Sequence, residues 1–273
     1  MCRYLLSKQT PVIATCRDPL KGQALTQLKT EHGDLLSIHR LDVLDENQIS
    51  EVAVSIGDTK LDLLVNCAGM LHPSGKGETS LREVDLQSLQ TTLATNALGP
   101  LIMAKHFSPM LTKRNSADKN AVAGVLVNIS ARVGSISDNA LGGWYSYRMS
   151  KSALNMATKN LSIELGRKRV ICVCLHPGTV NTDLSRRYHK NIDPAKIFTP
   201  EFSVNCLMKV IEGLEVKDNG KFFGWDGKEI PWGDPKRDFA ALRFQQVREE
   251  RWWKARKIIN CGILLNSPPN SQN

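Results

Sequence analysis

Short, β-branched hydrophobic runs alternate along the chain with longer segments of helical periodicity. Continuous apolar runs of this length are typical of parallel strands that are covered on both faces. Five buried strands are therefore predicted, over residues 11–16 (PVIATC), 35–43 (LLSIHRLDV), 60–69 (KLDLLVNCAG), 124–130 (GVLVNIS) and 170–175 (VICVCL).

Apolar residues recur at helical spacing between these runs. Helices are predicted over residues 45–56, 86–113 and 146–166. In the last of these, positions such as Met149 and Met156 lie on one face of the helix. Alternation of strands and helices at this spacing indicates repeated βαβ units, so the fold class is α/β with a doubly wound parallel sheet.

Composition limits the class of protein. The 273 residues are 41% hydrophobic and 23% charged, which excludes a disordered chain, a collagen and a coiled coil. The chain contains no run of the roughly 18 apolar residues that a membrane helix needs, and its start is too short in apolar residues for a secretory signal. Seven scattered cysteines without a Cys-x-x-Cys pair suit reduced thiols. We expect a cytoplasmic protein without a metal site, with organellar targeting left open.

The last part of the chain is strongly basic. Residues 233–273 hold eight Lys and Arg against four acids, within a net charge of +9 for the whole chain. An amphipathic helix is predicted over residues 238–257. A contact with acidic lipid, nucleic acid or a partner is one interpretation, and a solvated helix with a frayed end is the one we favour. The domain boundary is therefore expected between residues 1–232 and a basic extension over residues 233–273.

Tyr147 and Lys151 are four residues apart, which puts both side chains on one face of a helix, one turn apart. A free tyrosine has a pKa of roughly 10. A nearby lysine cation favours the phenolate and lowers that pKa, which makes the phenol a usable acid and base. By itself this spacing also occurs in ordinary surface helices.

Short motifs at the ends of the predicted strands and in the second helix accompany this pair. In their order and separation they resemble the short-chain dehydrogenase/reductase family, over residues 5–232. The segments 130–155 and 220–232 look like the branch that contains C-factor-type and sniffer-type carbonyl reductases. The motifs are residues 66–69 (NCAG), 96–99 (NALG), 128–130 (NIS) and 176–179 (HPGT).

The resemblance implies a Rossmann-type domain that binds a nicotinamide cofactor and reduces a carbonyl or oxidises an alcohol. Tyr147 matches the proton donor, and Lys151 matches the group that lowers its pKa and holds the nicotinamide ribose. Asn96 matches the residue whose helix kink positions a water in the proton relay. A homodimer or homotetramer is implied, packed through residues 86–113 and 147–166.

Further residues match the cofactor contacts of the family. They flank the adenine ring (Asp42, Val43), line the adenine ribose and support the central strand (Asn66, Ala68, Gly69), or cover the nicotinamide (Pro177, Gly178, Thr182).

Arg17 decides the expected choice of cofactor. It follows the first predicted strand, where a preference for NAD would call for an acid that bonds the ribose hydroxyls. A cation there suits the 2′-phosphate instead, so NADP is expected and NAD is less favoured.

The family serine departs from the pattern. In the family, a serine usually stands three residues before a glycine. In this chain the residue three before Gly134 is Ala131, so the serine is absent from the expected position. Ser130 is one residue away, and on a strand this shift turns a side chain to the other face. We name Ser130 as the candidate catalytic serine, with Ser135 as the second candidate.

The start of the fold also departs from the pattern. The family fold opens with a strand, a Gly-rich turn and a helix that holds the pyrophosphate. Residues 1–10 resemble only the C-terminal half of that helix, and the chain contains no Gly-x-x-x-Gly-x-Gly turn. We expect a domain that is incomplete at its N-terminus, with a vacant central position in the sheet, unpaired edges and poor NADPH binding. Residues 258–265 (IINCGILL) are the less favoured alternative, as a substitute strand.

The function predicted from these observations is an NADP-dependent oxidoreductase that acts on a small-molecule carbonyl or alcohol. Residues 183–200 are expected to form the lid over the substrate, which the sequence does not name. The alternative is a truncated, non-catalytic isoform that acts as a binding or heterodimerising subunit, which the absent Gly-rich turn favours. A protein that binds surfaces through its basic tail is the weakest of the three hypotheses.

Overall fold

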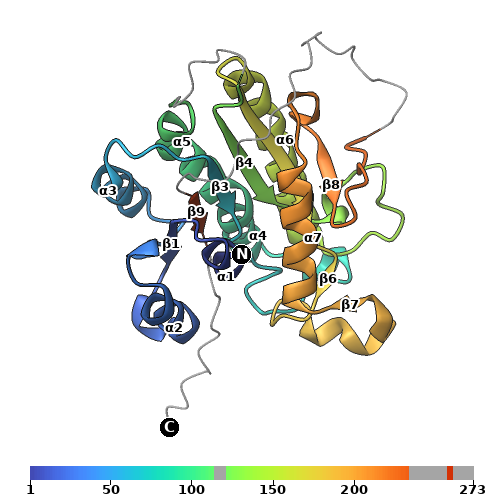
Figure 1. The fold of residues 1–273 in the computed structure, drawn as a ribbon. Coiled ribbons are helices and arrows are strands. Elements are labelled where there is room, and N and C mark those ends of the chain that lie inside the picture. The colour runs from blue at the N-terminus through green and yellow to red at the C-terminus, as the bar shows by residue number, and fades with distance from the viewer. Residues whose placement is uncertain (114–120, 234–256, 261–273) are drawn as a thin grey trace.

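The order of helices and strands follows the predicted alternation (Figure 1). The computed structural model describes residues 1–113, 121–233 and 257–260. The helices are α1 (Cys2–Ser7), α2 (Gln23–His32), α3 (Glu46–Ile56), α4 (Leu86–Leu93), α5 (Gly99–Leu111), α6 (Tyr145–Gly166) and α7 (Pro200–Glu212). The strands are β1 (Val12–Cys16), β2 (Leu36–Arg40), β3 (Leu63–Asn66), β4 (Gly124–Ile129), β5 (Val170–His176), β6 (Thr179–Val180), β7 (Ile197–Phe198), β8 (Phe222–Gly224) and β9 (Lys257–Asn260).

Seven of the described strands form one parallel sheet, in the order β2-β1-β9-β3-β4-β5-β8. All five predicted strands are confirmed, with small shifts at their ends. Strand β8 was not predicted, because three residues are too short for a recognisable hydrophobic pattern. The α/β doubly wound parallel sheet is therefore confirmed.

The centre of the sheet is where the structure corrects the sequence analysis. The position expected to be vacant is occupied by β9, which pairs in parallel with β1 on one side and β3 on the other. The less favoured alternative, a substitute strand from the C-terminal apolar patch, is confirmed for residues 258–260, while residues 261–265 lie outside the described part. Figure 1 shows β9 between β1 and β3. Backbone pairing decides this position, because a strand edge left open in the middle of a sheet has unpaired N–H and C=O groups.

Other expectations for the tail lie outside the described residues. The predicted amphipathic helix over residues 238–257 falls in the undescribed segment 234–256 except for its last residue, which begins β9. The basic extension therefore contributes one strand to the sheet of the main domain.

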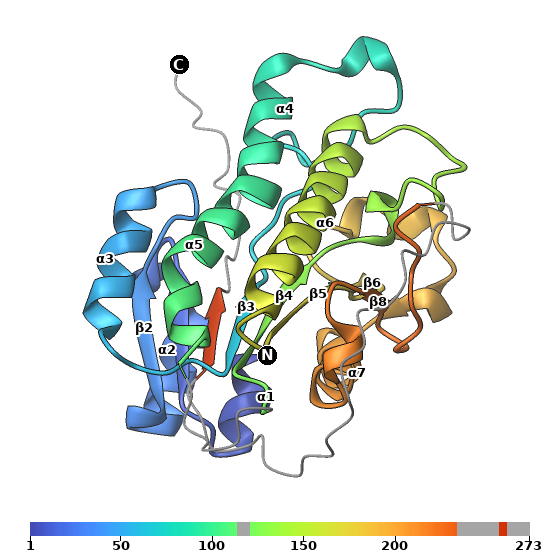
Figure 2. The ribbon, with the colours of Figure 1, turned by 90° about the horizontal axis from the view of Figure 1, so that it is seen from above.

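Helices cover both faces of the sheet. On one face, α3, α5 and α6 bury residues such as Ile49, Phe107 and Leu165 against the strands. On the other face, α1 and α2 pack through residues such as Leu5 and Leu25, and α7 joins them. Figure 2 shows α5 and α6 on one side of the sheet and α1 and α7 on the other. Burial on both faces explains why the strands have continuous rather than alternating hydrophobic patterns.

Candidate active site

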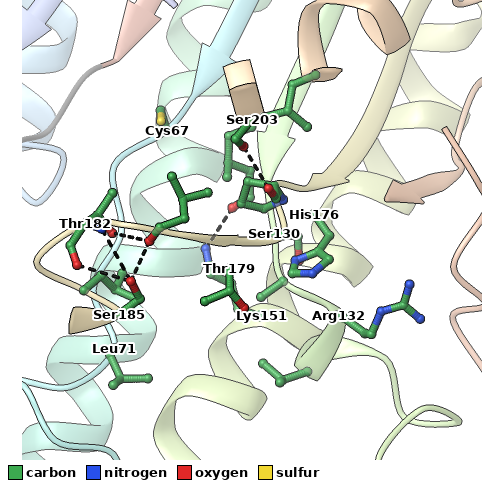
Figure 3. Close-up of a pocket in the computed structure, with 18 of the residues that line it drawn as sticks. Cys67, Leu71, Ser130, Arg132, Lys151, His176, Thr179, Thr182, Ser185 and Ser203 are labelled. Carbon is green, nitrogen blue, oxygen red and sulfur yellow. Dashed lines mark hydrogen bonds between the residues drawn. The ribbon is translucent and has the colours of Figure 1, made fainter. Parts of the chain in front are cut away.

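A cavity of about 410 Å³ lies beyond the carboxyl ends of β4 and β5 (Figure 3). In a parallel α/β sheet this edge is where ligands bind, because the connections that follow the strands leave a crevice there. The walls of the cavity are largely apolar and include Leu71, Ala131, Val133, Trp144 and Tyr188. An apolar cavity with a few polar groups suits a small organic ligand.

Tyr147 and Lys151 stand on this wall in the first two turns of α6. Tyr147 is 8% exposed and Lys151 is 4% exposed. The Lys151 ammonium donates to the carbonyl oxygen of Ile129 at 2.8 Å and lies 5.8 Å from the centroid of the Tyr147 ring. The predicted pair is therefore brought together at the cavity.

Burial governs the acid–base properties of this pair. It raises the pKa of the Tyr147 phenol above its ordinary value, and it lowers the pKa of Lys151 to about 8. The direction for Tyr147 is the opposite of the one expected from sequence, because the phenol is buried away from water. At neutral pH the phenol keeps its proton and the amine is mostly charged.

Asn96 lies in a π-helical turn, Ala94–Leu98, between α4 and α5. Its side chain is fully buried; its amide oxygen accepts from the N–H of Met70 at 2.8 Å. Its amide nitrogen donates to the carbonyl oxygen of Met70 at 2.7 Å and to the hydroxyl of Ser150 at 2.9 Å. The expected helix irregularity is present, and Asn96 ties the loop after β3 to α6.

The two candidate serines have other partners. The Ser130 hydroxyl donates to the amide oxygen of Asn155 on α6 at 2.6 Å. The Ser135 hydroxyl donates to the carbonyl oxygen of Pro231. Ala131 packs with Tyr147 at the cavity wall, so a methyl group occupies the position where the family serine was expected.

The segment after β5 forms another wall. Pro177, Gly178 and Thr182 line the same cavity as Tyr147. The carbonyl oxygen of Pro177 accepts from the hydroxyl of Ser203 on α7 at 2.8 Å. Gly178 has a φ of 77°, and a Cβ there would lie 2.5 Å from the ring of Phe198, so only glycine fits.

The remaining predicted cofactor residues lie at or just after the carboxyl ends of β1, β2 and β3, and none of them lines the cavity. Arg17 is exposed, directly after β1. The carboxylate of Asp42 accepts from the N–H of Leu44 at 3.0 Å. Asn66 donates to the amide oxygen of Asn128 at 2.8 Å, which links β3 to β4. The set consists of Arg17, Asp42, Val43, Asn66, Ala68 and Gly69.

Sequence reasoning did not single out several residues of the cavity. Trp144 and Tyr188 form an aromatic wall with ring centroids 4.9 Å apart. Tyr188 comes from the segment expected to be the lid, and Trp144 comes from the Gly-Gly-Trp turn before Tyr147. His176 also lines the cavity, and burial lowers its pKa to about 4, so its ring is neutral. Trp144 lies in a segment quoted for the resemblance and Tyr188 in the segment expected to form the lid, but their contact joins parts of the chain that are distant in sequence.

The described residues contain no helix that is long and apolar enough to cross a membrane. They also contain no group of three or more His, Cys, Asp or Glu side chains with the arrangement of a metal site.

A family model described as short chain dehydrogenase matches residues 1–193. The fold, the Tyr147 and Lys151 pair and this match agree, and the chain belongs to the short-chain dehydrogenase/reductase family.

Within that family the similar proteins indicate a carbonyl-reductase-like branch. The NADPH-bound carbonyl reductase from chicken fatty liver has a TM-score of 0.74 and 34% identity, covering 84% of this chain and 92% of that one. The carbonyl reductase Sniffer of D. melanogaster has a TM-score of 0.74 and 30% identity, covering 84% and 93%. The C-signal protein of Myxococcus xanthus is 35% identical over 66% of this chain and 98% of its own length. The predicted resemblance is thereby confirmed.

Proposed function

We propose that this oxidoreductase reduces the carbonyl group of a small molecule with NADPH, or oxidises the corresponding alcohol with NADP. The observation that carries the proposal is the buried pair of Tyr147 and Lys151 at the wall of an apolar cavity of about 410 Å³. An apolar wall excludes water from the carbonyl, and the pair supplies the proton.

The residues around the pair fit a nicotinamide cofactor. Gly69 has no side chain, and a Cβ there would lie 3.2 Å from the amide oxygen of Asn96 and 3.5 Å from the Lys151 nitrogen. This glycine therefore keeps space open beside the lysine, where a ribose would be held. In our proposal Pro177, Gly178 and Thr182 cover the nicotinamide from the opposite wall.

When bound, the cofactor supplies a hydride to the carbonyl carbon. Tyr147 is protonated at neutral pH because burial raises its pKa, and it gives that proton to the carbonyl oxygen. Lys151, mostly charged below its pKa of about 8, holds the ribose hydroxyls and stabilises the phenolate that is left. Asn96 holds the loop after β3 against α6, which fixes the position of that loop relative to the helix that carries Tyr147 and Lys151.

No serine hydroxyl is assigned to the substrate in this proposal. The hydroxyl of Ser130, the candidate from sequence, donates a hydrogen bond to the amide oxygen of Asn155 and ties the end of β4 to α6. The cavity wall at Ala131 is apolar, so Tyr147 is the proposed donor to the carbonyl oxygen.

The preference for NADP over NAD is proposed from charge. Arg17 is an exposed cation at the carboxyl end of β1, where it suits the 2′-phosphate. We propose that Asp42 and Val43 flank the adenine ring and that Asn66, Ala68 and Gly69 line its ribose. The NADPH-bound state of the similar chicken carbonyl reductase supports this choice.

A non-catalytic binding or heterodimerising subunit is the second candidate function. It was expected because the sequence contains no Gly-x-x-x-Gly-x-Gly turn to hold a pyrophosphate, and the similarity to carbonyl reductases does not favour it. The presence of Tyr147 and Lys151, both at the cavity, favours the enzyme.

A homodimer or homotetramer is proposed as well. Large apolar side chains are exposed along the helices expected to pack together, and a contact between copies would bury them. They are Leu86, Leu98 and Leu101 on the α4 to α5 segment and Met149, Met156 and Ile163 on α6. Sedimentation equilibrium would test this, with a monomer at all concentrations as the contrary result.

We also propose a cytoplasmic location. The six described cysteines are free thiols, which suits a reducing compartment. Fractionation of cells that express the protein would test this.

The experiment that tests the function compares the protein with its Tyr147→Phe variant. NADPH binding is titrated by fluorescence, and carbonyl reduction is followed by the loss of NADPH absorbance with a panel of aldehydes and ketones. We expect reduction by the unchanged protein, and a severe loss of kcat with nearly unchanged NADPH affinity in the variant. A chain that binds no NADPH would favour the non-catalytic subunit, and a fully active Tyr147→Phe variant would remove Tyr147 from the mechanism.

A further inference from the structure

A buried carboxylate lies against the start of the helix that carries Tyr147. Glu78 belongs to the segment between β3 and α4 and is 3% exposed. Its carbonyl oxygen accepts from the N–H of Trp144 at 2.6 Å. Its carboxylate accepts from the N–H of Ser146 at 3.1 Å and also from the Ser146 hydroxyl. The Glu78 carboxylate thus holds both the backbone N–H and the hydroxyl of Ser146, the residue directly before Tyr147.

The backbone that Glu78 holds is in an unusual conformation. Gly142, Gly143 and Trp144 have φ values of 66°, 64° and 49°, and the last of these is strained for a residue with a large side chain. Such a conformation persists only where the surrounding structure fixes it. A Cβ at Gly77 would lie 2.6 Å from the Trp144 ring, so the two segments are in close contact.

Glu78 also supplies the cap that α6 lacks. The first N–H groups of a helix have no partner within the helix. The side chain of Trp144, the N-cap residue of α6, accepts no hydrogen bond from them. A carboxylate is favoured there by the partial positive charge of the helix N-terminus. Glu78 therefore satisfies the Ser146 N–H from a distant part of the chain.

His72 completes the surroundings of this carboxylate. Its Nδ1 accepts from the N–H of Ser74 at 3.2 Å, which assigns the ring proton to Nε2. That nitrogen lies 3.9 Å from the Glu78 carboxylate, too far for a hydrogen bond. Burying a carboxylate has a cost in free energy unless hydrogen bonds offset it, and here the described bonds come from Ser146.

The same segment holds the lid. The N–H of Gly77 donates to the hydroxyl of Tyr188 at 2.9 Å, and the Tyr188 ring packs on Trp144. The backbone next to Glu78 thus fixes one aromatic wall of the cavity while its carboxylate fixes the first turn of α6.

We infer that Glu78 is a positioning residue for Tyr147, acting through hydrogen bonds to Ser146 and Trp144 that set where the phenol meets the substrate carbonyl. The catalytic part of this inference rests on the proposed carbonyl reduction. Displacement of a reacting group by about 1 Å lowers a rate by up to about 100-fold, so loss of the clamp should appear in kcat.

Two variants of Glu78 and one matched control distinguish a positioning role of the Glu78 carboxylate from a general effect of losing a carboxylate in this segment. Glu78→Ala removes the acceptor, and Glu78→Gln keeps an acceptor oxygen of the same length. Glu83→Gln is the control, because Glu83 is an exposed carboxylate five residues away whose side-chain partners, Thr79 and Lys76, belong to its own segment. We expect Glu78→Ala to lower kcat about 10- to 100-fold with little change in KM or NADPH affinity. Glu78→Gln should restore most of kcat, and Glu83→Gln should match the unchanged protein.

Hydrogen exchange gives a readout that does not need activity. The Ser146 amide should exchange faster in Glu78→Ala than in the unchanged protein, whereas amides in the second half of α6 should keep their protection. A general loss of stability would instead speed exchange along the whole helix.

The outcomes are distinct. An Ala variant with unchanged kcat, a Gln variant as slow as the Ala variant, or unchanged exchange at Ser146 would each overturn the inference. If the Ala variant does not fold, Glu78→Asp takes its place, because it keeps the charge but draws the carboxylate back by one methylene, and the Ser146 amide should then exchange faster than in Glu78→Gln. If the unchanged protein reduces no carbonyl, the proposed function fails, and exchange at Ser146 still decides whether Glu78 clamps α6.

Discussion

The strand β9 should be essential for stability, although it comes from the far end of the chain. Its four residues pair with β1 and again with β3, so it closes the sheet at its centre. Truncation before Lys257 removes both ladders. Truncation after Asn260 keeps them and serves as the matched control.

The expected magnitude follows from the pairing. Each neighbour has four residue pairs with β9, and a backbone hydrogen bond contributes about 1 kcal/mol net. With about one bond per pair on each side, loss of both ladders lowers the free energy of unfolding by about 8 kcal/mol. Domains are stable by only about 5–15 kcal/mol, so the shorter truncated chain should be largely unfolded.

Urea unfolding followed by circular dichroism measures the difference between the two truncated chains. A point variant, Ile258→Pro, tests the same strand with the full chain. Proline removes a ladder N–H and is not tolerated in a central strand, so a loss of about 3 kcal/mol or more is expected. Equal stability of both truncated chains, together with a neutral Ile258→Pro, would refute the assignment of β9 to the centre of the sheet.

Three further predictions concern the site. Ala131→Ser places a hydroxyl on the cavity wall beside Tyr147 and should raise kcat about 10-fold or more, because one donor to a developing oxyanion raises a rate roughly 100-fold. The exposed Ala140→Ser is the control. A rise of kcat in both variants, or in neither, would contradict the prediction. Arg17→Asp should weaken NADPH binding by about 1.5–3 kcal/mol and NADH binding less, measured by fluorescence titration, whereas equal losses would show that Arg17 does not contact the phosphate. Burial lowers the pKa of Lys151 to about 8, so its ammonium is present below that pH and lost above it. The kcat for reduction should therefore fall as the pH rises through 8. A kcat that stays level across that range would exclude a role for the ammonium.

The local pattern of apolar and polar residues was enough to predict the five strands and the three helical segments named in the sequence analysis. The runs that became β1, β3, β4 and β5 are largely apolar because both of their faces are covered, and this pattern is visible in each segment separately. The edge strand β2 is only partly buried and mixes apolar with polar residues. The spacing of Tyr147 and Lys151 likewise fixes their place on one face of α6, whatever the rest of the chain does. These features depend on residues that are neighbours in sequence.

Other features depend on partners that are distant in sequence, and only the tertiary structure decided them. Strand β9 is short, and its place follows from the two open edges of β1 and β3 rather than from its own pattern. Ser130 and Ala131 both line the cavity, and the partner of the Ser130 hydroxyl is Asn155, which lies on another element. The raised pKa of Tyr147 reflects burial by the assembled walls, and Glu78 reaches Ser146 across 68 residues. The sequence by itself determined β1 to β5, the helical segments 45–56, 86–113 and 146–166 and the Tyr147–Lys151 pair, because short-range periodicity encodes them. Strand order, side-chain partners and the electrostatics of the site are set by contacts that form only when the chain has folded.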